Sequence, residues 1–463
     1  NYLGYKLAQY KKGVTLDKNA KKRKEQGIYY TPSFIVDYIV KNALKPVLDK
    51  CKTIEDLKKI KVLDPACGSG SFLIKALEVI ADKYEDLGRG SGFLTKVQIL
   101  TENIYGVDLD SQAVEIAQLN LLIGALDQRR KLPSLAKNIK NGNSLISGTD
   151  EELEKQFGKN WRDKKPFNWQ EEFPQVFKEG GFDVIIGNPP YIKEFVNKSA
   201  FDGLHNSPYY QGKMDLWTMF SCAAIALLKD GGILSFIAPN NWVTNAGASI
   251  FRDKILKEGE LRSFVDFGDY KVFEDAGIQT MIFVFEKKKP SEKYEIDYLK
   301  IADKNSTEDK LIVDIFNKET KIEIEPKKLI GGNITFAKTE SNSIFDKIES
   351  KKNFELTDKE VAQGIVADPD KAFIFLETKK FSSVEQESLK KYFTSVSRYC
   401  AGEQRGLIAY LDKSKNYDIE KLPEIKNQLL KFKKELDNRR EVKNGRLNWF
   451  NLHWPRDEMF FIS

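Results

Sequence analysis

Short apolar runs alternate with longer amphipathic segments between Lys61 and Lys287. In the longer segments apolar residues recur every three or four positions, which predicts helices, for example over Ser71–Asp86 and Ser111–Ala125. Seven of the short runs are rich in β-branched residues and predict strands: Lys61–Ala66, Ile104–Leu109, Ile139–Ile146, Phe182–Gly187, Gly232–Ala238, Leu261–Phe267 and Thr280–Glu286. Strands that alternate with helices are typical of an α/β domain with a largely parallel sheet.

The segment ahead of this alternation predicts one more helix. Thr31-Pro32-Ser33 has the composition of a helix start, with Ser33 as the candidate N-cap. The residues expected on its buried face are Phe34, Ile35, Tyr38 and Ile39. Residues 1–26 are rich in lysine, and we interpret them as a basic N-terminal segment that is helical or connects to the rest.

The character of the sequence changes after Lys287. Residues 287–291 read Lys-Lys-Lys-Pro-Ser, a polar stretch interrupted by proline, so we interpret 288–329 as a linker region. The remaining residues, 330–463, are aromatic and charged with mixed periodicity, which indicates a separate domain. Its fold cannot be read from this pattern, and we expect it to be α+β. No internal repeat of solenoid spacing and no low-complexity tract is found in the sequence.

Length and composition narrow the class of protein. A chain of 463 residues exceeds what one hydrophobic core usually supports, so two or three domains are expected. The four cysteines are scattered and there are two histidines, which supports neither a disulfide framework nor a metal site. The sequence has no apolar run long enough to cross a bilayer and no secretory signal, so we expect a reducing cytoplasm and no membrane partner.

The net charge of +6 is a mild excess that proves nothing about nucleic acid by itself. The distribution matters more, because basic residues gather in two clusters: Lys18, Lys21, Lys22, Arg23 and Lys24 near the start, and Lys431, Lys433, Lys434, Arg439, Arg440, Lys443 and Arg446 near the end. Each cluster is either a surface that contacts phosphates or a solvated helix face, and the sequence leaves both interpretations open.

The first predicted strand runs into a glycine-bearing turn and then a helix. The sequence from Val62 to Leu73 is Val-Leu-Asp-Pro-Ala-Cys-Gly-Ser-Gly-Ser-Phe-Leu. Glycines let the backbone approach a ligand closely, above the N-terminus of the helix. The dinucleotide pattern Gly-x-Gly-x-x-Gly lacks its third glycine here, and Gly-Lys-Ser/Thr of a phosphate-binding loop is missing. The residues that we expect to bind a cofactor in this turn are Asp64, Ala66, Cys67, Gly68 and Gly70.

The second predicted strand ends in a carboxylate, as ribose recognition requires in a doubly wound sheet. Asp108 is our candidate to accept hydrogen bonds from both ribose hydroxyls, whereas Asp110 more simply caps the helix that follows. About forty residues separate Asp108 from the glycine turn, against about twenty in dinucleotide-binding proteins, so the spacing argues against NAD.

A third motif follows the buried strand Phe182–Gly187. The chain continues as Asn188-Pro189-Pro190-Tyr191, and the two prolines make this loop stiff. A plain proline turn is the alternative, but its coincidence with the glycine turn and the ribose carboxylate argues against that.

These three motifs, in this order, resemble the gamma class of adenine-N6 DNA methyltransferases, particularly the methylase part of type IIG restriction-modification enzymes. The resemblance is strong over 27–287 and implies a Rossmann-like, seven-stranded domain that uses S-adenosylmethionine. Gly27-Ile28-Tyr29-Tyr30-Thr31-Pro32 matches the N-terminal cofactor motif of this family, which implies that Thr31 contacts the methionine moiety. Asn143 stands where the family often has an Asp against the cofactor's adenine.

The loop suits a reaction on an amino nitrogen. An adenine amine is a poor nucleophile because its lone pair is delocalised into the ring. The side-chain oxygen of Asn188 and the carbonyl of Pro189 can accept its two hydrogens, while Pro190 helps to fix the direction of the loop. Tyr191 offers a face on which an extruded base can stack, and Phe273 stands at the family's second base-stacking position or is a core residue.

Other segments separate DNA from protein substrates. Asn-Pro-Pro-Tyr also occurs in glutamine methyltransferases that act on release factors, but Gly212–Trp217 and Leu227–Gly232 resemble later motifs of the DNA enzymes. Val361–Ile365 and a basic helix over Leu422–Arg440 resemble target-recognition regions of type IIG enzymes, so we expect 330–463 to bind double-stranded DNA. The alternatives are a protein glutamine methyltransferase and a DNA-specificity module without catalysis. A nuclease domain or subunit outside this chain is also possible, because the chain begins without Met.

Overall fold

The computed structural model describes residues 5–10, 13–18, 30–126, 132–273, 277–317, 320–334, 336, 347, 351, 365–376, 379–393, 396–397, 400–401 and 404–455. The chain divides into two compact units, Asn1–Asp346 and Lys347–Ser463. None of the described helices is long and apolar enough to cross a membrane.

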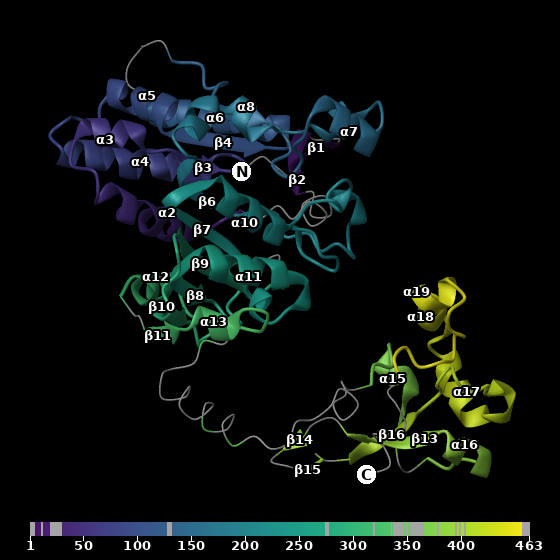
Figure 1. Ribbon diagram of the computed structural model, residues 1–463. Coiled ribbons are helices and arrows are strands. Elements are labelled where there is room, and N and C mark those ends of the chain that lie inside the picture. Colours follow the sequence, from purple (N-terminus) through teal and green to yellow (C-terminus); the bar gives the residue numbers. More distant parts are fainter. Residues whose placement is uncertain are drawn as a thin grey trace. The chain divides into compact units, whose positions relative to one another are not determined.

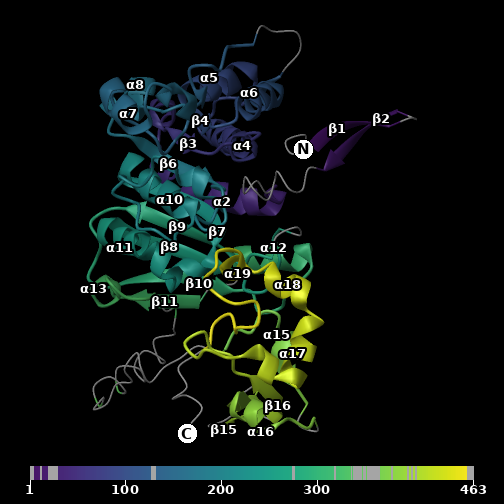
Figure 2. The ribbon, with the colours of Figure 1, turned by 90° about the vertical axis from the view of Figure 1, so that its right-hand side faces the viewer.

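The first unit is built on a nine-stranded sheet with the order β11-β10-β8-β9-β7-β6-β3-β4-β5 (Figures 1 and 2). The strands are β3 (Val62–Asp64), β4 (Ile104–Asp108), β5 (Ile139–Asn141), β6 (Phe182–Gly187), β7 (Leu228–Pro239), β8 (Gly259–Asp266), β9 (Thr280–Lys287), β10 (Tyr294–Lys300) and β11 (Thr320–Ile324). Strands β5, β4, β3, β6 and β7 are parallel neighbours. Strand β9 runs antiparallel to both of its neighbours, β7 and β8. The predicted α/β class with a mostly parallel sheet is confirmed.

All seven expected strands are found, but the region expected as a linker, 288–329, is part of the fold. It forms β10, α12 (Glu308–Asn317), β11 and α13 (Pro326–Leu329), and its two strands extend the sheet. The lysine-rich stretch that suggested a boundary is a turn instead, since Glu260 accepts from the backbone N–H of Ser291 at 2.8 Å and pairs with Lys288 at 2.5 Å. The division between the units also lies later than the expected residue 330.

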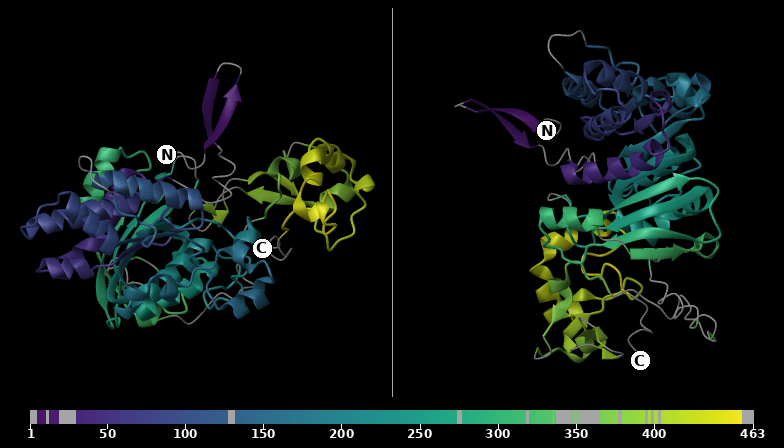
Figure 3. Two further views of the ribbon diagram at one scale, coloured as in Figure 1. Left: turned by 90° about the horizontal axis from the view of Figure 1, so that it is seen from above. Right: turned by 90° about the vertical axis from the view of Figure 1, so that its left-hand side faces the viewer.

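Helices cover both faces of this sheet. On one face α2 packs against β6, β7 and β9 as well as against α4 and α12, while α10 and α11 pack on β7 and β8 (Figure 3). Helix α4 packs on β3 and β4, and α6 packs on β4 and β5. The bounds are α2 (Ser33–Leu48), α3 (Ile54–Lys59), α4 (Ser71–Asp86), α5 (Phe93–Glu102), α6 (Ser111–Ala125), α7 (Asp150–Phe157), α8 (Trp169–Glu172), α9 (Pro174–Lys178), α10 (Leu216–Leu227) and α11 (Ser249–Glu258).

Helix α2 was predicted with the right buried face and the wrong cap. Phe34, Ile35, Tyr38 and Ile39 are all buried, as expected. Ser33, however, is the first helical residue, and the N-cap position is taken by Pro32, which has no side chain to accept a hydrogen bond. The backbone of Pro32 starts the helix by accepting from the N–H groups of residues 35 and 36.

The N-terminal segment is a hairpin where a helical or connecting segment was expected. Strands β1 (Tyr5–Tyr10) and β2 (Gly13–Lys18) pair antiparallel, with Tyr10 opposite Gly13. The apolar residues Tyr5, Leu7, Val14 and Leu16 alternate with other residues, and a period of two favours strands over a helix. Lys21 to Lys24 of the first basic cluster lie outside the described residues.

The second unit combines small antiparallel sheets with short helices, in agreement with the α+β prediction. Its strands are β12 (Ile374–Phe375), β13 (Leu389–Phe393), β14 (Val396–Ser397), β15 (Cys400–Ala401) and β16 (Gln404–Ala409), in the orders β12-β16-β13 and β14-β15. Its helices are α15 (Asp370–Phe373), α16 (Ser383–Glu387), α17 (Pro423–Leu430), α18 (Lys433–Asp437) and α19 (Arg440–Lys443). The continuous helix expected over 422–440 is therefore three short helices.

Candidate functional site

Four strands of the first unit end at one edge of the sheet, and they carry the predicted site residues. Asp64 ends β3, Asp108 ends β4, Asn141 ends β5 and Gly187 ends β6. Because these strands are parallel neighbours, their carboxyl ends meet. In open α/β sheets this edge is where ligands bind. The sheet topology thus brings together the glycine-bearing turn, the strand-end carboxylate Asp108 and the Asn-Pro-Pro-Tyr loop.

The turn between β3 and α4 has the backbone conformation that requires glycine. Gly68 has φ +53° and Gly70 has φ +85°, both in the left-handed region. A Cβ on Gly70 would lie 3.3 Å from the Cβ of Ala117, so α6 packs closely against this turn. A Cβ on Gly68 would meet no described atom within 4 Å. The turn is therefore packed against the fold at Gly70 and open toward a ligand at Gly68.

Two side chains that the sequence did not single out brace this turn. The amide of Asn120 on α6 donates to the carbonyl of Ser69 at 3.0 Å. The hydroxyl of Ser144 donates to the carbonyl of Pro65 at 2.6 Å. Both carbonyls belong to the turn, so these bonds fix its path from two sides. Helix α6 carries several other polar residues, so the sequence did not distinguish Asn120.

Asp108 is held by two backbone groups. Its Oδ2 accepts from the N–H of Gly68 at 2.8 Å, and its Oδ1 accepts from the N–H of Asp110 at 2.9 Å. Burial raises the pKa of this carboxyl, and the backbone hydrogen bonds oppose that shift. Each oxygen of a carboxylate has a second lone pair, so the group can still accept from ligand hydroxyls. Asp110 caps α6 as expected, since it accepts from the N–H of Gln112 at 3.0 Å.

Asp64 is a buried carboxyl beside the turn. Its Oδ1 accepts from the N–H of Ala66 at 3.0 Å. Its Oδ2 is buried and accepts no hydrogen bond from any described residue, and we call such an atom an open acceptor. Burial raises the pKa of Asp64 to about 8, and the neighbouring Asp108 adds to the increase. The thiol of Cys67 is buried toward the position of Gly106, and burial raises its pKa well above the usual range. Only the backbone of Cys67 can therefore face a ligand.

Asn143 follows β5 and uses its side-chain oxygen within its own turn. The Oδ1 accepts from the N–H of Leu145 at 3.1 Å, and the backbone N–H of Asn143 donates to the carbonyl of Lys165 at 2.7 Å. The side-chain nitrogen, a donor, is consequently the group that Asn143 can offer to the edge of an adenine.

The loop after β6 places Asn188 against two other motifs. A Cβ on Gly187 would lie 2.7 Å from Oδ1 of Asp64, so only glycine fits between the loop and that carboxyl. The Nδ2 of Asn188 donates to Oγ1 of the buried Thr31 at 3.1 Å. The Oδ1 of Asn188 is a second open acceptor, buried without a partner among the described residues. The hydrogen bond from Nδ2 therefore fixes the amide while its oxygen stays available.

Tyr191 and Phe273 lie together, both buried. Their ring centroids are 6.1 Å apart with an interplanar angle of 66°, an edge-to-face contact. The hydroxyl of Tyr191 donates to the carbonyl of Ile237 on β7 at 2.9 Å. The structure thus places the two predicted stacking residues in one cluster. Both rings are also part of the hydrophobic core of the first unit.

Asp215, at the start of α10, was not predicted as a site residue. The backbone around Asp215 pairs with the segment that follows Tyr191, because the N–H of Leu216 donates to the carbonyl of Ile192 at 2.9 Å. Its Oδ1 is a third open acceptor among the described side chains. Burial raises the pKa of Asp215 to about 6, opposed by the charge of Lys193. An aspartate directly ahead of an apolar helix was the available sequence signal.

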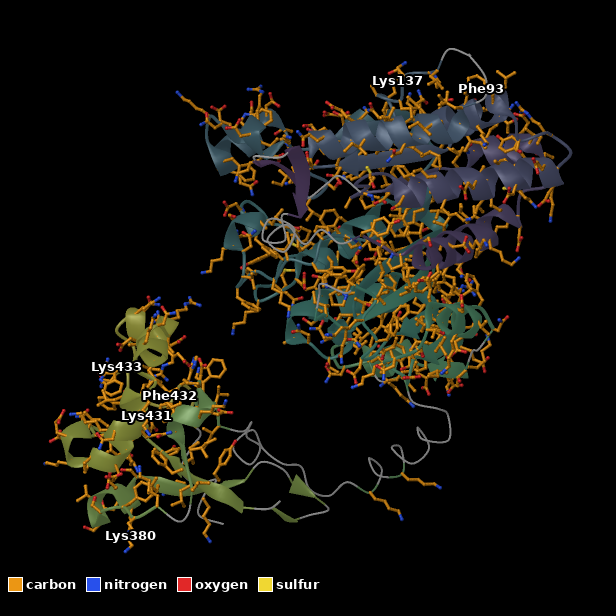
Figure 4. All side chains as sticks on the ribbon, turned by 180° about the vertical axis from the view of Figure 1, so that it is seen from behind. Phe93, Lys137, Lys380, Lys431, Phe432 and Lys433 are labelled. Carbon is orange, nitrogen blue, oxygen red and sulfur yellow. The ribbon has the colours of Figure 1, made fainter. Side chains whose placement is uncertain are left out.

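The basic cluster of the second unit is only partly exposed to solvent. Arg439 is buried, and its guanidinium donates to the carbonyls of Leu436, Trp449 and Asn451 at 3.2, 2.7 and 2.9 Å. In a continuous helix the carbonyl of Leu436 would accept from a backbone N–H of the next turn. Here the guanidinium of Arg439 donates to it, close to the end of α18. Exposed basic side chains remain at Lys431, Lys434, Arg440, Lys443 and Arg446. Figure 4 shows Lys431, Phe432 and Lys433 side by side on this unit.

Known proteins resemble this chain over the same site. The family described as Eco57I restriction-modification methylase matches residues 102–273, and the RMKL-like methyltransferase domain family matches 55–138. The type II restriction enzyme and methyltransferase RM.Eco57I of Escherichia coli is 29% identical over 300 residues, which cover 57% of this chain and 28% of that protein. The adenine-specific methyltransferase PglX of Streptomyces coelicolor is 26% identical over 226 residues, which cover 45% of this chain and 18% of PglX.

A solved structure agrees in fold. The type IIL restriction-modification enzyme MmeI, in complex with DNA, superposes with a TM-score of 0.58 at 14% identity, over 94% of this chain and 58% of that one. This chain spans less than a third of the length of either relative. The family-model match over 102–273 includes β6 and the Asn-Pro-Pro-Tyr loop. The family-model match and the relatives are thus similar to this chain in the region whose motifs resemble the restriction-modification methylases.

Proposed function

We propose that this chain transfers a methyl group from S-adenosylmethionine to the N6 amino group of adenine in double-stranded DNA, as the modification activity of a restriction-modification system. The observation that carries the proposal is the state of Asn188. Its oxygen is an open acceptor at the sheet edge where ligands bind, and its nitrogen is fixed by Thr31. An amide held in this way is prepared to accept a hydrogen from an incoming amine.

The residues around the glycine turn fit the cofactor. Gly68 leaves space at the turn, Asp108 has lone pairs for ribose hydroxyls, and the open acceptor of Asp64 suits a ligand that carries positive charge. Asn143 offers its nitrogen to the cofactor's adenine, and Thr31 keeps a hydroxyl hydrogen for the methionine moiety. When bound, S-adenosylmethionine supplies a methyl group activated by a sulfonium.

The catalytic loop orients the amine. Asn188 Oδ1 accepts one amine hydrogen and the Pro189 carbonyl accepts the other, which localises the nitrogen lone pair toward the methyl group. Pro189 and Pro190 restrict the backbone, so the two acceptors are aimed before the base arrives. No general base with a tuned pKa is needed, because the amine becomes strongly acidic only after alkylation. Tyr191, and Phe273 if it is not a core residue only, would stack on the extruded adenine.

The second unit is our candidate target-recognition domain. It carries exposed basic side chains at Lys431, Lys434 and Arg440, which are suited to contact phosphates while other residues read base edges. The family also includes proteins whose names join a restriction enzyme to a methyltransferase, so a nuclease domain or subunit outside this chain is part of the proposal.

The proposal is tested by incubating the full chain with labelled S-adenosylmethionine and unmodified plasmid DNA, followed by mass spectrometry of the nucleosides. We expect N6-methyladenine, and sequencing of the modified adenines would give the recognition sequence. N4-methylcytosine instead would contradict the choice of base. Label in a protein acceptor would favour a glutamine methyltransferase, and DNA binding without transfer would favour a specificity module.

A further inference from the structure

The turn that follows the catalytic loop carries two apolar side chains at its tip. Phe195 and Val196 are each 68% exposed, and among the large apolar residues that the structure describes only Leu376 is more exposed. Exposing a Phe to water gives up the favourable free energy of burying it, so such a tip is unusual unless it meets a partner.

Hydrogen bonds hold this turn in shape. The N–H of Val196 donates to the carbonyl of Lys193 at 2.9 Å, which closes the turn. The N–H of Glu194 donates to the carbonyl of Met214 at 3.0 Å, which ties the turn to the segment ahead of α10. The carboxylate of Glu194 accepts from the N–H of Lys213 at 2.6 Å and from the hydroxyl of Tyr210. The apolar tip is thus presented by a braced backbone.

The tip lies close along the chain to the Asn-Pro-Pro-Tyr loop. Phe195 stands five positions after Pro190, and five extended residues span at most about 18 Å. Tyr191 and Phe195 therefore belong to one short segment, yet Tyr191 is buried and Phe195 faces solvent. The ring of Tyr191 therefore belongs to the candidate site, whereas the ring of Phe195 is available to contact a partner outside the fold.

Charge indicates what the tip would meet. Lys193 and Lys198 are exposed on either side of it, and the ammonium of Lys193 lies 5.9 Å from the centroid of the Phe195 ring. The acidic side chain of the turn, Glu194, is directed inward to Tyr210 and Lys213. An apolar tip between two cations is complementary to a base stack between two phosphate backbones.

We propose that Phe195, supported by Val196, is a wedge that enters the base stack at the target site and fills the space left by the extruded adenine. This inference rests on the proposed function and deepens it. Extrusion breaks stacking and pairing, and apolar side chains inserted between bases offset part of that cost. The wedge should therefore matter for a paired target and not for one that is already unpaired.

The test compares two duplexes that contain a site methylated by the wild-type chain in plasmid DNA. In one the target adenine faces thymine, and in the other it faces an abasic position. Phe195→Ala should methylate the paired duplex about 10- to 100-fold more slowly, as expected for a lost stacking partner. It should methylate the abasic duplex at nearly the wild-type rate and bind S-adenosylmethionine normally in calorimetry.

Two further variants complete the test. Phe195→Trp keeps a flat apolar ring and should retain most of the rate on the paired duplex. Leu94→Ala removes a side chain of α5 that is 66% exposed and should match the wild type on both duplexes. An unchanged rate of Phe195→Ala on the paired duplex, an equal loss on both duplexes, or a Trp variant as slow as the Ala variant would overturn the wedge. Absence of adenine methylation by the wild type would instead show that the proposed function fails.

Discussion

Asp64, buried at the carboxyl end of β3, and Asp183, half-buried near the amino end of the neighbouring strand β6, have opposite surroundings. Asp183 accepts from the N–H of Lys61 at 2.8 Å and pairs with the ammonium of Lys229 at 2.9 Å. Burial raises the pKa of Asp183, but the bond from Lys229 opposes it. Asp64 has no comparable cation among the described residues, and its Oδ2 is an open acceptor.

This difference in pairing distinguishes polar groups that stabilise the fold from polar groups that are available to a ligand. A buried charge is ordinarily paired, because leaving it alone costs more than the protein gains. At the amino end of the sheet this rule is obeyed by Asp183. At the carboxyl end Asp64, Asn188 and Asp215 all keep an open acceptor. The edge that carries the motifs thus holds three open acceptors, while Asn103, directly ahead of β4 at the other edge, holds another.

The largest effect is expected for the open acceptor of the catalytic loop. Asn188→Ala removes the oxygen that accepts from the amine, so methyl transfer to plasmid DNA should slow by roughly 100- to 1000-fold. Binding of S-adenosylmethionine, measured by calorimetry, should be nearly normal because the proposed contact of Asn188 is to the adenine and not to the cofactor. Substantial turnover by this variant would contradict the mechanism.

The paired aspartate should matter for stability instead. Asp183→Ala leaves the N–H of Lys61 and the ammonium of Lys229 without their acceptor, and we expect a loss of about 2–3 kcal/mol in the free energy of unfolding by urea. Asp64→Ala is the matched control, because it removes a carboxyl that has a single hydrogen bond. Similar losses for both variants would contradict the contrast between the two ends of the sheet.

Asp108 belongs to the ligand edge but is already held by backbone N–H groups. Asp108→Ala should weaken S-adenosylmethionine binding by roughly 1–3 kcal/mol, as expected when ligand hydroxyls lose a charged acceptor. Calorimetry on the protein without DNA measures this directly. An unchanged affinity would remove Asp108 from the cofactor site.

Asp64 predicts a pH dependence of stability. Its pKa is about 8 in the folded chain, against the ordinary value of 3.8. Between these values the folded chain holds a proton that the unfolded chain has released, so this carboxyl lowers stability as pH rises through the window. The penalty is complete above pH 8. Asp64→Asn should therefore gain stability relative to the wild type as urea unfolding is repeated from pH 5 to pH 8.5. A constant difference across this range would contradict the shift.

The smallest effect concerns one hydroxyl. Tyr191→Phe loses the bond to the carbonyl of Ile237, which should cost about 1 kcal/mol of unfolding free energy. The ring remains, so stacking on an extruded base should survive. Duplexes with 2-aminopurine at the target should brighten with this variant as with the wild type, whereas Tyr191→Ala should change the signal. Phe273→Ala tests the second ring. A lower free energy of unfolding with unchanged 2-aminopurine fluorescence would show that Phe273 is a core residue only.

The sequence allowed prediction of the elements that have a clear period and of the residues at strand ends. The seven strands and the helices Ser71–Asp86 and Ser111–Ala125 follow from local pattern. Strands β10 and β11 did not, because a lysine-rich turn with a proline precedes them and each buries few apolar residues. The contact between Thr31 and Asn188, the braces from Asn120 and Ser144, and the open acceptors are products of tertiary packing. For these contacts the local sequence offers at most a polar residue in a suggestive place, such as the aspartate ahead of α10.

The hydrogen bond from Asn188 to Thr31 joins residues that are 157 positions apart. A ribosome that adds about 5–20 residues per second needs roughly 10–30 s to travel from one to the other. During that interval the hydroxyl of Thr31 lacks its hydrogen bond from Asn188. The amide of Asn188 is fixed only after β6 has been synthesised and has packed against α2. The chain therefore gains its reactive geometry late in its own synthesis, when the two ends of this long loop finally close.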